Sequence, residues 1–176
     1  MAFIRVKTSK RKNGTVVEYA YIVENRRVRK KKIKQKSKKY LGRVYRFDRS
    51  GVMDFYEFHD IDNVETYLNE RTKEEILLDL IRLELSNHGF EKEKWIWAKE
   101  GCYFDEKGMK MHNEKGNNIA VAFNEGFLTT YAVRKLLGFV AYDEEEGYDF
   151  AKMFIEAGIA IPKDVFVGFF RKSMHP

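Results

Sequence analysis

The chain has 176 residues, of which 44% are apolar and 15% aromatic, and it carries a formal net charge of +6. This composition supports a hydrophobic core and excludes a compositionally disordered chain. No apolar run approaches the roughly 18 residues of a membrane-spanning helix, and residues 1–5 lack the long apolar centre of a signal peptide. We therefore expect a cytoplasmic protein with no membrane partner.

The N-terminal part is expected to form an antiparallel three-stranded sheet. The strands are predicted at about residues 3–7, 15–24 and 28–45. Asn13-Gly14 between the first two is typical of a β-hairpin turn, and Gly42 marks a break in the third. A three-stranded sheet is marginal unless one face is covered. We expect the face with Tyr19 and Tyr21 to pack against the rest of the chain, leaving the lysine rows outside.

The next segment is expected to be largely helical. It begins with a strand or irregular stretch at residues 52–59, and the capping-box pattern at residues 62–65 then opens a short helix. A second capping box starts at Thr72 and leads into a helix over residues 73–86, which ends near Gly89. Because this helix is apolar around much of its circumference, we expect it at the centre of the core.

Strand patterns return after this helix and are followed by three helices. A β-meander is predicted at residues 95–98, 102–104, 109–112 and 119–123. The helices are predicted at residues 127–137, 147–157 and 162–171, with Pro162 as the first helical residue of the last one. The predicted fold class is therefore α+β. A small basic three-stranded antiparallel β-module packs on a mixed α+β domain with a central buried helix, a β-meander and three C-terminal helices.

Charge is distributed unevenly along the chain. Residues 1–50 contain 18 Lys and Arg but only three acids, whereas residues 51–176 have a balance of −9. We expect a basic β-module and an α+β domain with these bounds, and the basic one points to a polyanionic partner. Alternate residues of a strand lie about 6.6 Å apart, close to the spacing of phosphates in a nucleic acid. The lysines in such a row are Lys30, Lys32, Lys34, Lys36 and Lys38.

The basic stretch from Arg26 to Arg46, in which 12 of 21 residues are Lys or Arg, supplies most of the predicted nucleic-acid contacts. They are Arg26, Arg27, Arg29, Lys30, Lys31, Lys32, Lys34, Lys36, Lys38, Lys39, Arg43, Arg46, Tyr40, Trp95 and Trp97. The aromatic members are predicted to stack on unpaired bases, with Trp95 and Trp97 on one strand face. The alternatives are that these rings pack in a small core and that the lysines only keep an edge strand from pairing.

Signals for catalysis and for metal or cofactor binding are weak. The histidines His59, His88, His112 and His175 are scattered, and Cys102 is the only cysteine. A single cysteine excludes an internal disulfide, and we interpret it as a small half-buried hydrophobic residue. The acidic run at residues 143–146 precedes a helix, where acids favour the positive end of the helix dipole. We expect no enzyme activity, no cofactor and no metal.

Four short N-terminal motifs together resemble a known module. They are Phe3-Ile4-Arg5-Val6-Lys7, Tyr19-Ala20-Tyr21-Ile22-Val23-Glu24-Asn25, Val28-Arg29-Lys30 and Lys39-Tyr40-Leu41-Gly42-Arg43-Val44. Over about 45 residues they are similar to the N-terminal DNA-binding module of insertion-element transposases, and of archaeal proteins that carry this module alone.

The resemblance implies that the N-terminal strands sit on DNA. The phosphate contacts that it implies are Arg29, Lys30, Lys32 and Lys39. Residues 51–176 are too few for the transposase catalytic domain and show no spaced acidic triad, so strand transfer is not implied. No family is recognised in this C-terminal part.

We therefore predict a non-catalytic nucleic-acid-binding protein that contacts the phosphate backbone through a Lys/Arg-rich strand, with DNA slightly favoured. The first alternative is an RNA-binding or ribosome-associated protein, because lysine-rich strands suit rRNA equally well. Two others are a metal-dependent nuclease that uses Asp105 or the acidic run, and an interaction protein whose acidic C-terminal domain docks on a basic partner. A single glutamine, Gln35, among 34% charged residues is typical of a thermophile, and the resemblance points to an archaeal source.

Overall fold

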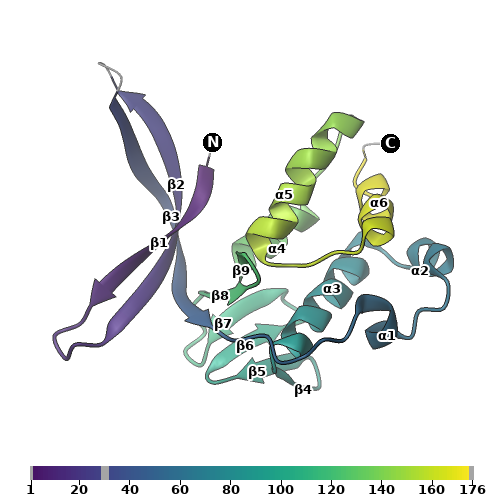
Figure 1. The fold of residues 1–176 in the computed structure, drawn as a ribbon, viewed down its shortest axis with the longest axis horizontal. Coiled ribbons are helices and arrows are strands. Elements are labelled where there is room, and N and C mark those ends of the chain that lie inside the picture. The colour runs from purple at the N-terminus through teal and green to yellow at the C-terminus, as the bar shows by residue number, and fades with distance from the viewer. Residues whose placement is uncertain (1, 29–31, 175–176) are drawn as a thin grey trace.

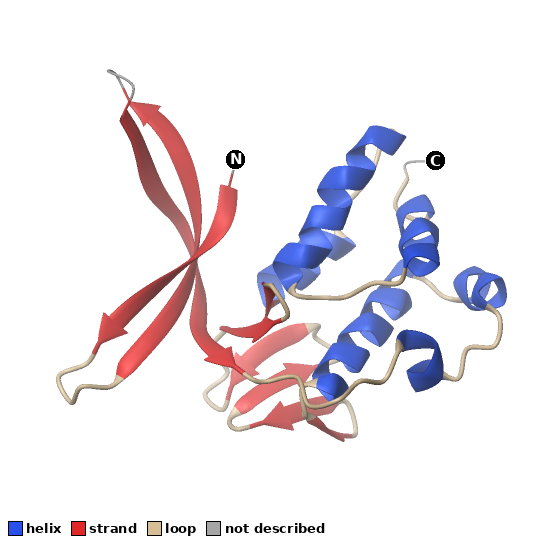
Figure 2. Ribbon diagram, viewed as in Figure 1, coloured by secondary structure: helices blue, strands red, loops and turns tan. Residues whose placement is uncertain are grey.

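The structure, a computed structural model, describes residues 2–28 and 32–174. Within these residues, it contains a five-stranded sheet, a four-stranded sheet and six α-helices, which confirms the predicted α+β class. The first three strands form a long twisted sheet that reaches away from the body of the molecule (Figure 1). The helices lie together on the other side, above the four-stranded sheet (Figure 2).

The five-stranded sheet joins the N-terminal strands to the body. Its strands are, in spatial order, β1 (Ala2–Lys10), β2 (Val16–Val28), β3 (Lys32–Arg46), β8 (Ile119–Phe123) and β9 (Gly126–Thr129). The first three are antiparallel, as predicted, but β3 also pairs in parallel with β8, from Arg43 opposite Ile119 to Arg46 opposite Ala122. A domain boundary near residue 50 would therefore divide strands of one sheet, and that division stays a prediction.

The face of β2 that packs on the body is not the tyrosine face, so that prediction is wrong. Ala20 and Ile22 on the opposite face are buried in a small apolar cluster, together with Ala120 of β8. Tyr19 and Tyr21 are only half-buried. A buried tyrosine needs a partner for its hydroxyl, whereas Ala20 and Ile22 are apolar throughout. Alternation along a strand shows two faces but does not say which one is covered.

The central helix of the core is α3 (Lys73–Asn87), as predicted. Its capping box at Thr72 is present, and Leu77, Leu80 and Ile81 are completely buried. Two short helices, α1 (Phe55–His59) and α2 (Val64–Glu70), precede it. The strand or irregular stretch predicted at residues 52–59 is therefore partly wrong, because the Asp54 side chain accepts hydrogen bonds from the N–H groups of two residues in the first turn of α1.

The predicted meander and C-terminal helices are present with some changes. The four-stranded sheet comprises β4 (Glu91–Glu93), β5 (Ile96–Lys99), β6 (Cys102–Asp105) and β7 (Lys110–Asn113), paired in chain order. The strand predicted at residues 119–123 is β8 of the other sheet, and the charged β4 takes the remaining place in the meander.

The last part of the chain is helical, as predicted. The elements are α4 (Thr130–Leu137), the 3-10 turn η1 (Glu144–Glu146), α5 (Gly147–Ala157) and α6 (Lys163–Arg171). The helix predicted from residue 127 begins later because β9 occupies its start, and Pro162 caps α6 instead of beginning it. Among the described residues, no helix combines the length and the apolar character needed to cross a membrane.

Candidate nucleic-acid interface

The basic stretch follows the far part of the β2–β3 ladder. Arg29, Lys30 and Lys31 lie outside the described residues. Arg26 and Arg27 lie in β2, and the register places Arg26 opposite Lys34 and Val28 opposite Lys32. The ladder thus places basic residues of the two strands at neighbouring positions.

The predicted lysine row is regular only in part. Lys32, Lys34 and Lys36 take alternate positions in an unbroken stretch of the ladder. The register then shifts, because Val23 pairs with Ser37 while its neighbour pairs with Lys39. Lys38 is the extra residue of this bulge, which interrupts the row.

Two of the predicted contacts are neutralised by carboxylates. The Lys38 Nζ lies 2.9 Å from a carboxylate oxygen of Glu24, and the Arg46 Nε donates to Glu18 over 2.7 Å. Three other predicted contacts, all exposed, form no ion pair with any described residue. These three are Lys36, Lys39 and Arg43. No described carboxylate competes with an external anion for them.

Three tyrosines form a cluster on the face of the sheet opposite Ala20 and Ile22. Tyr19 and Tyr21 share a face of β2, and Tyr40 pairs with Tyr21 across the ladder. The Tyr40 ring centroid is 5.3 Å from that of Tyr21 and 6.2 Å from that of Tyr19, while 53% of the residue stays exposed. Partial burial and the neighbouring phenols raise the pKa of Tyr40 above its usual value of 10.0, so its hydroxyl is neutral at physiological pH.

The cations near this cluster lie over aromatic rings. The Lys7 Nζ is 4.8 Å from the Tyr21 centroid, and the Arg43 guanidinium is 4.9 Å from that of Tyr45. Lys39 lies at 4.9 Å from the ring of Tyr131 in α4. A ring attracts a cation by about 0.5–1 kcal/mol at an exposed site, without cancelling its charge. These contacts orient the side chains and preserve a positive surface.

A polar groove separates β3 from the turns of the four-stranded sheet. One hollow, of about 610 Å³, is lined by residues that include Tyr19, Arg43 and Tyr45, with Glu100 and Glu114 on the opposite wall. An adjoining hollow of about 450 Å³ is lined by Tyr40, Arg43, Asn113, Asn117, Asn118 and Ile119. Arg43 lines both hollows, as do Asn113 and Asn117, and therefore lies where the two hollows meet.

Gly42 permits the close approach that forms this groove. Its φ is +136°, and a Cβ at this position would lie 2.3 Å from the carbonyl oxygen of Asn118. Any other residue would push β3 away from β8, where Arg43 pairs with Ile119. At the break predicted near Gly42, β3 continues, but its pairing with β2 shifts register, since Ala20 pairs with Gly42 and Tyr21 with Tyr40.

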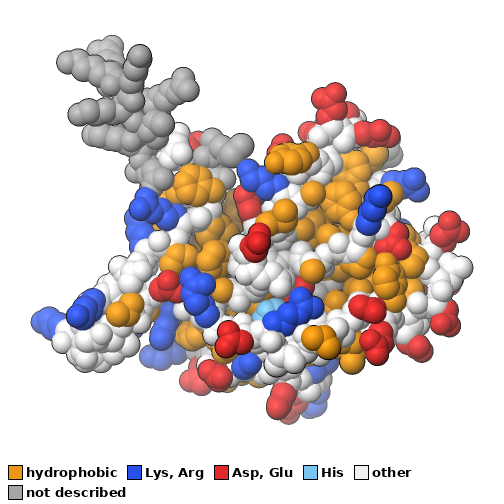
Figure 3. Space-filling model, in the orientation of Figure 1, with side chains coloured by type: hydrophobic (Ala, Val, Ile, Leu, Met, Phe, Trp, Pro, Cys, Tyr) orange, Lys and Arg blue, Asp and Glu red, His pale blue; other side chains and the backbone are white. Residues whose placement is uncertain are grey.

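Charge gathers over the N-terminal strands on the face drawn in Figure 3. Lys and Arg side chains lie over the sheet on the left, whereas Asp and Glu side chains are spread along the helices on the right (Figure 3). This separation matches the balance along the sequence, and the described part of the basic segment holds only the acids Glu18, Glu24 and Asp48.

The two tryptophans do not form the predicted stacking pair. Trp97 is only 5% exposed, and its Nε1 donates to the Glu106 carboxylate over 2.8 Å. Trp95 lies in the turn before β5, 43% exposed, with the Lys107 Nζ 3.6 Å from its ring centroid. Because β5 begins one residue later than predicted, the alternation that placed both rings on one face does not hold. Trp97 belongs to the core.

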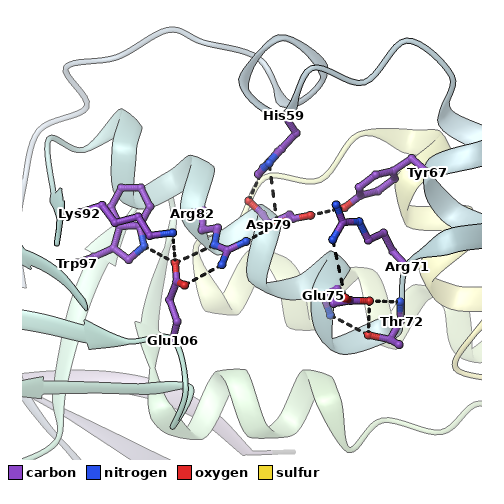
Figure 4. Close-up of polar contacts among 10 residues, drawn as sticks. All are labelled: His59, Tyr67, Arg71, Thr72, Glu75, Asp79, Arg82, Lys92, Trp97 and Glu106. Atoms are coloured by element: carbon purple, nitrogen blue, oxygen red, sulfur yellow. Dashed lines mark hydrogen bonds and ion pairs between the residues drawn. The ribbon is translucent and has the colours of Figure 1, made fainter. Parts of the chain in front are cut away.

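A second cluster of charges lies inside the body (Figure 4). Arg82 of α3 donates two hydrogen bonds to Glu106, of 2.8 and 2.7 Å, and the Lys92 Nζ lies 3.0 Å from the same carboxylate. Burial alone would raise the pKa of Glu106, but hydrogen bonds from Arg82, Trp97 and Lys92 outweigh it and hold the pKa at about 2. This carboxylate is saturated by its partners and ties α3 to the β-meander.

Asp79 extends the same network toward the short helices. It accepts hydrogen bonds from the Tyr67 hydroxyl at 3.0 Å and from Arg82 at 2.9 Å. Its backbone carbonyl lies 2.9 Å from the Nε2 of His59, whose pKa is lowered by burial. These partners hold α1 and α2 against α3, as Figure 4 shows, so the network has a structural role.

The carboxylates of the nuclease alternative bind backbone groups. Asp105 accepts the N–H of Lys107 in the turn after β6, and Asp143 caps η1. Across residues 2–28 and 32–174, no group of three or more His, Cys, Asp or Glu side chains is arranged to hold a metal ion. Cys102 is fully buried and not half-buried as predicted. Burial raises the pKa of its thiol to about 12, which suits the predicted hydrophobic role.

Five residues of the interface were not predicted from the sequence. They are Lys7, Tyr45, Asn117, Asn118 and Tyr131. Tyr45 could have been predicted, because the alternation of side chains along a strand places it on the same face of β3 as Arg43. The asparagines and Tyr131 come from distant segments, and only the pairing of β3 with β8 brings them near the basic strand.

Comparison with known proteins adds no family. No family model, no curated protein and no solved structure matches this chain. The resemblance to the transposase module therefore stays a prediction that rests on the four N-terminal motifs.

Proposed function

We propose that the chain is a non-catalytic, cytoplasmic nucleic-acid-binding protein that holds the phosphate backbone on the sheet formed by β1–β3. The observation that carries the proposal is the set of exposed cations on β3 that no described carboxylate neutralises. They are Lys36, Lys39 and Arg43. They belong to a segment with 18 basic residues and three acids.

A structural role does not account for this excess of charge. Cations that stabilise this fold, such as Arg82, are bound to carboxylates, whereas Lys36, Lys39 and Arg43 of β3 have no described carboxylate to offset their mutual repulsion. Binding to phosphates relieves this repulsion and releases the counterions condensed on the nucleic acid. Such contacts are independent of sequence, because phosphates are identical at every step. The N-terminal motifs favour DNA.

A charge-removal experiment with a matched control tests the proposal. One variant replaces Lys32, Lys34 and Lys36 by Ser, and the control replaces three exposed bases at the ends of α6. The control residues are Lys163, Arg171 and Lys172. Both variants lose three charges. Affinity for labelled duplex DNA is measured by fluorescence anisotropy at about 100 mM salt.

We expect the β3 variant to bind at least about 10-fold more weakly on every sequence, and the control to bind within about twofold of the wild type. Circular dichroism should show an unchanged fold in both, since like charges that are close together contribute little to stability. Equal losses in the two variants, or no binding by the wild type to DNA or RNA, would contradict the proposal.

A further inference from the structure

We infer that the hollow beside Tyr40 takes an unpaired nucleotide, so that the site binds single-stranded nucleic acid more tightly than duplex. This inference rests on the proposed function and assigns the chemistry of one part of the same site. The hollow has a volume of about 450 Å³, within the range of pockets that hold small ligands.

The aromatic wall of the hollow is Tyr40. Its ring is half exposed, and it is held in place by Tyr19 and Tyr21 at 6.2 and 5.3 Å. A ring that is fixed by its neighbours but open on one side offers a stacking surface at little entropic cost. Every base has a flat π-face, and stacking on an aromatic side chain is worth about 1–3 kcal/mol per base.

The opposite wall carries amide groups with unused hydrogen-bonding capacity. The Asn113 Oδ1 accepts two backbone N–H groups at 3.0 Å, which leaves its amide N–H groups without a described partner. The Asn118 Oδ1 accepts only the Thr130 hydroxyl, and the Asn117 side chain forms no hydrogen bond with the described residues. Amide side chains pair with the edges of bases, which are accessible when the base is unpaired.

The distribution of charge favours the phosphate backbone of a bound nucleic-acid strand on the β3 side of the hollow. Arg43 lines the hollow with Tyr40 and is not paired with a described carboxylate, whereas Lys39 pairs with Ile22 and lies over the Tyr131 ring. The far wall of the adjoining hollow carries Glu100 and Glu114 with Lys115, so acids outnumber bases there and favour phosphates less than the β3 side does. A base that leaves the backbone toward the asparagines therefore passes the Tyr40 ring. In a duplex, both faces of each base are stacked and its pairing edge is occupied, so these contacts cannot form.

The test compares strandedness in the full-length protein. Tyr40→Leu removes the ring, and Tyr40→Phe is the matched control that keeps it. Affinity is measured by anisotropy at about 100 mM salt with labelled single-stranded DNA, single-stranded RNA of the same sequence, and the DNA duplex. Thermal melting checks the fold of each variant, and Asn117→Ala probes the other wall at an exposed position if Tyr40→Leu fails to fold.

We expect the wild type to favour a single strand by about 10-fold. Tyr40→Leu should lose about 5- to 100-fold on single strands, with little change on duplex, and Tyr40→Phe should bind like the wild type. Asn117→Ala should weaken single-strand binding alone, by a few-fold. A stronger response with DNA or with RNA identifies the source of the unpaired nucleotide, and either response supports the inference.

Equal wild-type affinity for single strands and duplex overturns the inference, as does a Tyr40→Leu variant that binds both like the wild type. Because duplex binding persists in these outcomes, the proposed function stands. No wild-type binding to any of the three probes instead overturns the proposed function, and the inference with it.

Discussion

The cations of β3 and those around Glu106 have different surroundings. In the body, Arg82 and Lys92 lie within hydrogen-bonding distance of one carboxylate, and this network joins α3 to the β-meander. On β3, Lys39 and Arg43 rest against tyrosine rings and have no described carboxylate partner. The residue types are similar in both places, but only the second group keeps its charge available.

The comparison separates stability from binding. A buried carboxylate that loses its cation is left uncompensated, which destabilises a protein by several kcal/mol. An exposed cation over a ring has water as an alternative partner, and its removal costs little. Substitutions in the body should therefore change the free energy of unfolding, and substitutions on β3 should change affinity for nucleic acid.

The largest effect is expected for Arg82→Gln. This change leaves Glu106 and Asp79 without their shared cation, and we expect a loss of about 3 kcal/mol in the free energy of unfolding. Urea unfolding followed by circular dichroism measures it. Affinity for DNA under conditions where the variant is folded should stay within about twofold. A loss below about 1 kcal/mol would show that the network is peripheral to stability.

The acid sensitivity of the protein should depend on Glu106. Its pKa in the fold, about 2, is depressed below the ordinary value of 4.5. Its stabilising effect is therefore complete above about pH 4.5 and is lost as the pH falls toward 2. Between pH 5 and pH 3, the wild type should lose more stability in urea unfolding than Glu106→Gln, whereas Glu93→Gln in the exposed β4 should behave like the wild type. Parallel pH profiles of all three would contradict this.

The junction between the sheet and the body should be sensitive to Gly42. A Cβ at this position meets the Asn118 carbonyl at 2.3 Å, so Gly42→Ala should cost about 1–3 kcal/mol in the free energy of unfolding. Gly14→Ala is the matched control: its φ is also positive, at +84°, but nothing lies within 4 Å of the added methyl. If the two variants have equal melting temperatures, strain alone explains both and the close approach has no consequence.

The smallest effect on stability is expected for Arg43→Gln. This side chain is exposed, lies over the ring of Tyr45 and forms no ion pair with a described residue, so the free energy of unfolding should change by less than about 0.5 kcal/mol. Affinity should nevertheless fall several-fold, because Arg43 lies where the two hollows meet. A large loss of stability with unchanged affinity would assign Arg43 to the structural group of cations.

Local signals in the sequence predicted most of the secondary structure. The capping box at Thr72 and the positive-φ stop at Gly158 mark the start of α3 and the end of α5 where the structure has them. Such signals act within one turn of helix and need no knowledge of the fold. The predicted boundaries were wrong where one segment suits two elements. Residues 126–129, for example, form β9 against β8 instead of the first turn of α4.

The candidate site was only partly predictable for the same reason. The charge of β3 is a property of consecutive residues, and the sequence shows it directly. Which face of β2 is covered, and which turn lies opposite Tyr40, depend on the parallel pairing of β3 with β8, two strands separated by more than 70 residues. No periodicity within either segment specifies that contact, so Asn117 and Asn118 could not be assigned to the site.

The most direct test of phosphate binding by β3 is the salt dependence of affinity for duplex DNA. If about six phosphates are neutralised, log K should fall with log salt concentration at a slope near −5 for the wild type and for the α6 control variant. Replacement of Lys32, Lys34 and Lys36 by Ser removes up to three contacts and should bring the slope to about −2 to −3. A wild-type slope shallower than about −1, or the same slope in all three proteins, would contradict a phosphate-binding role for β3.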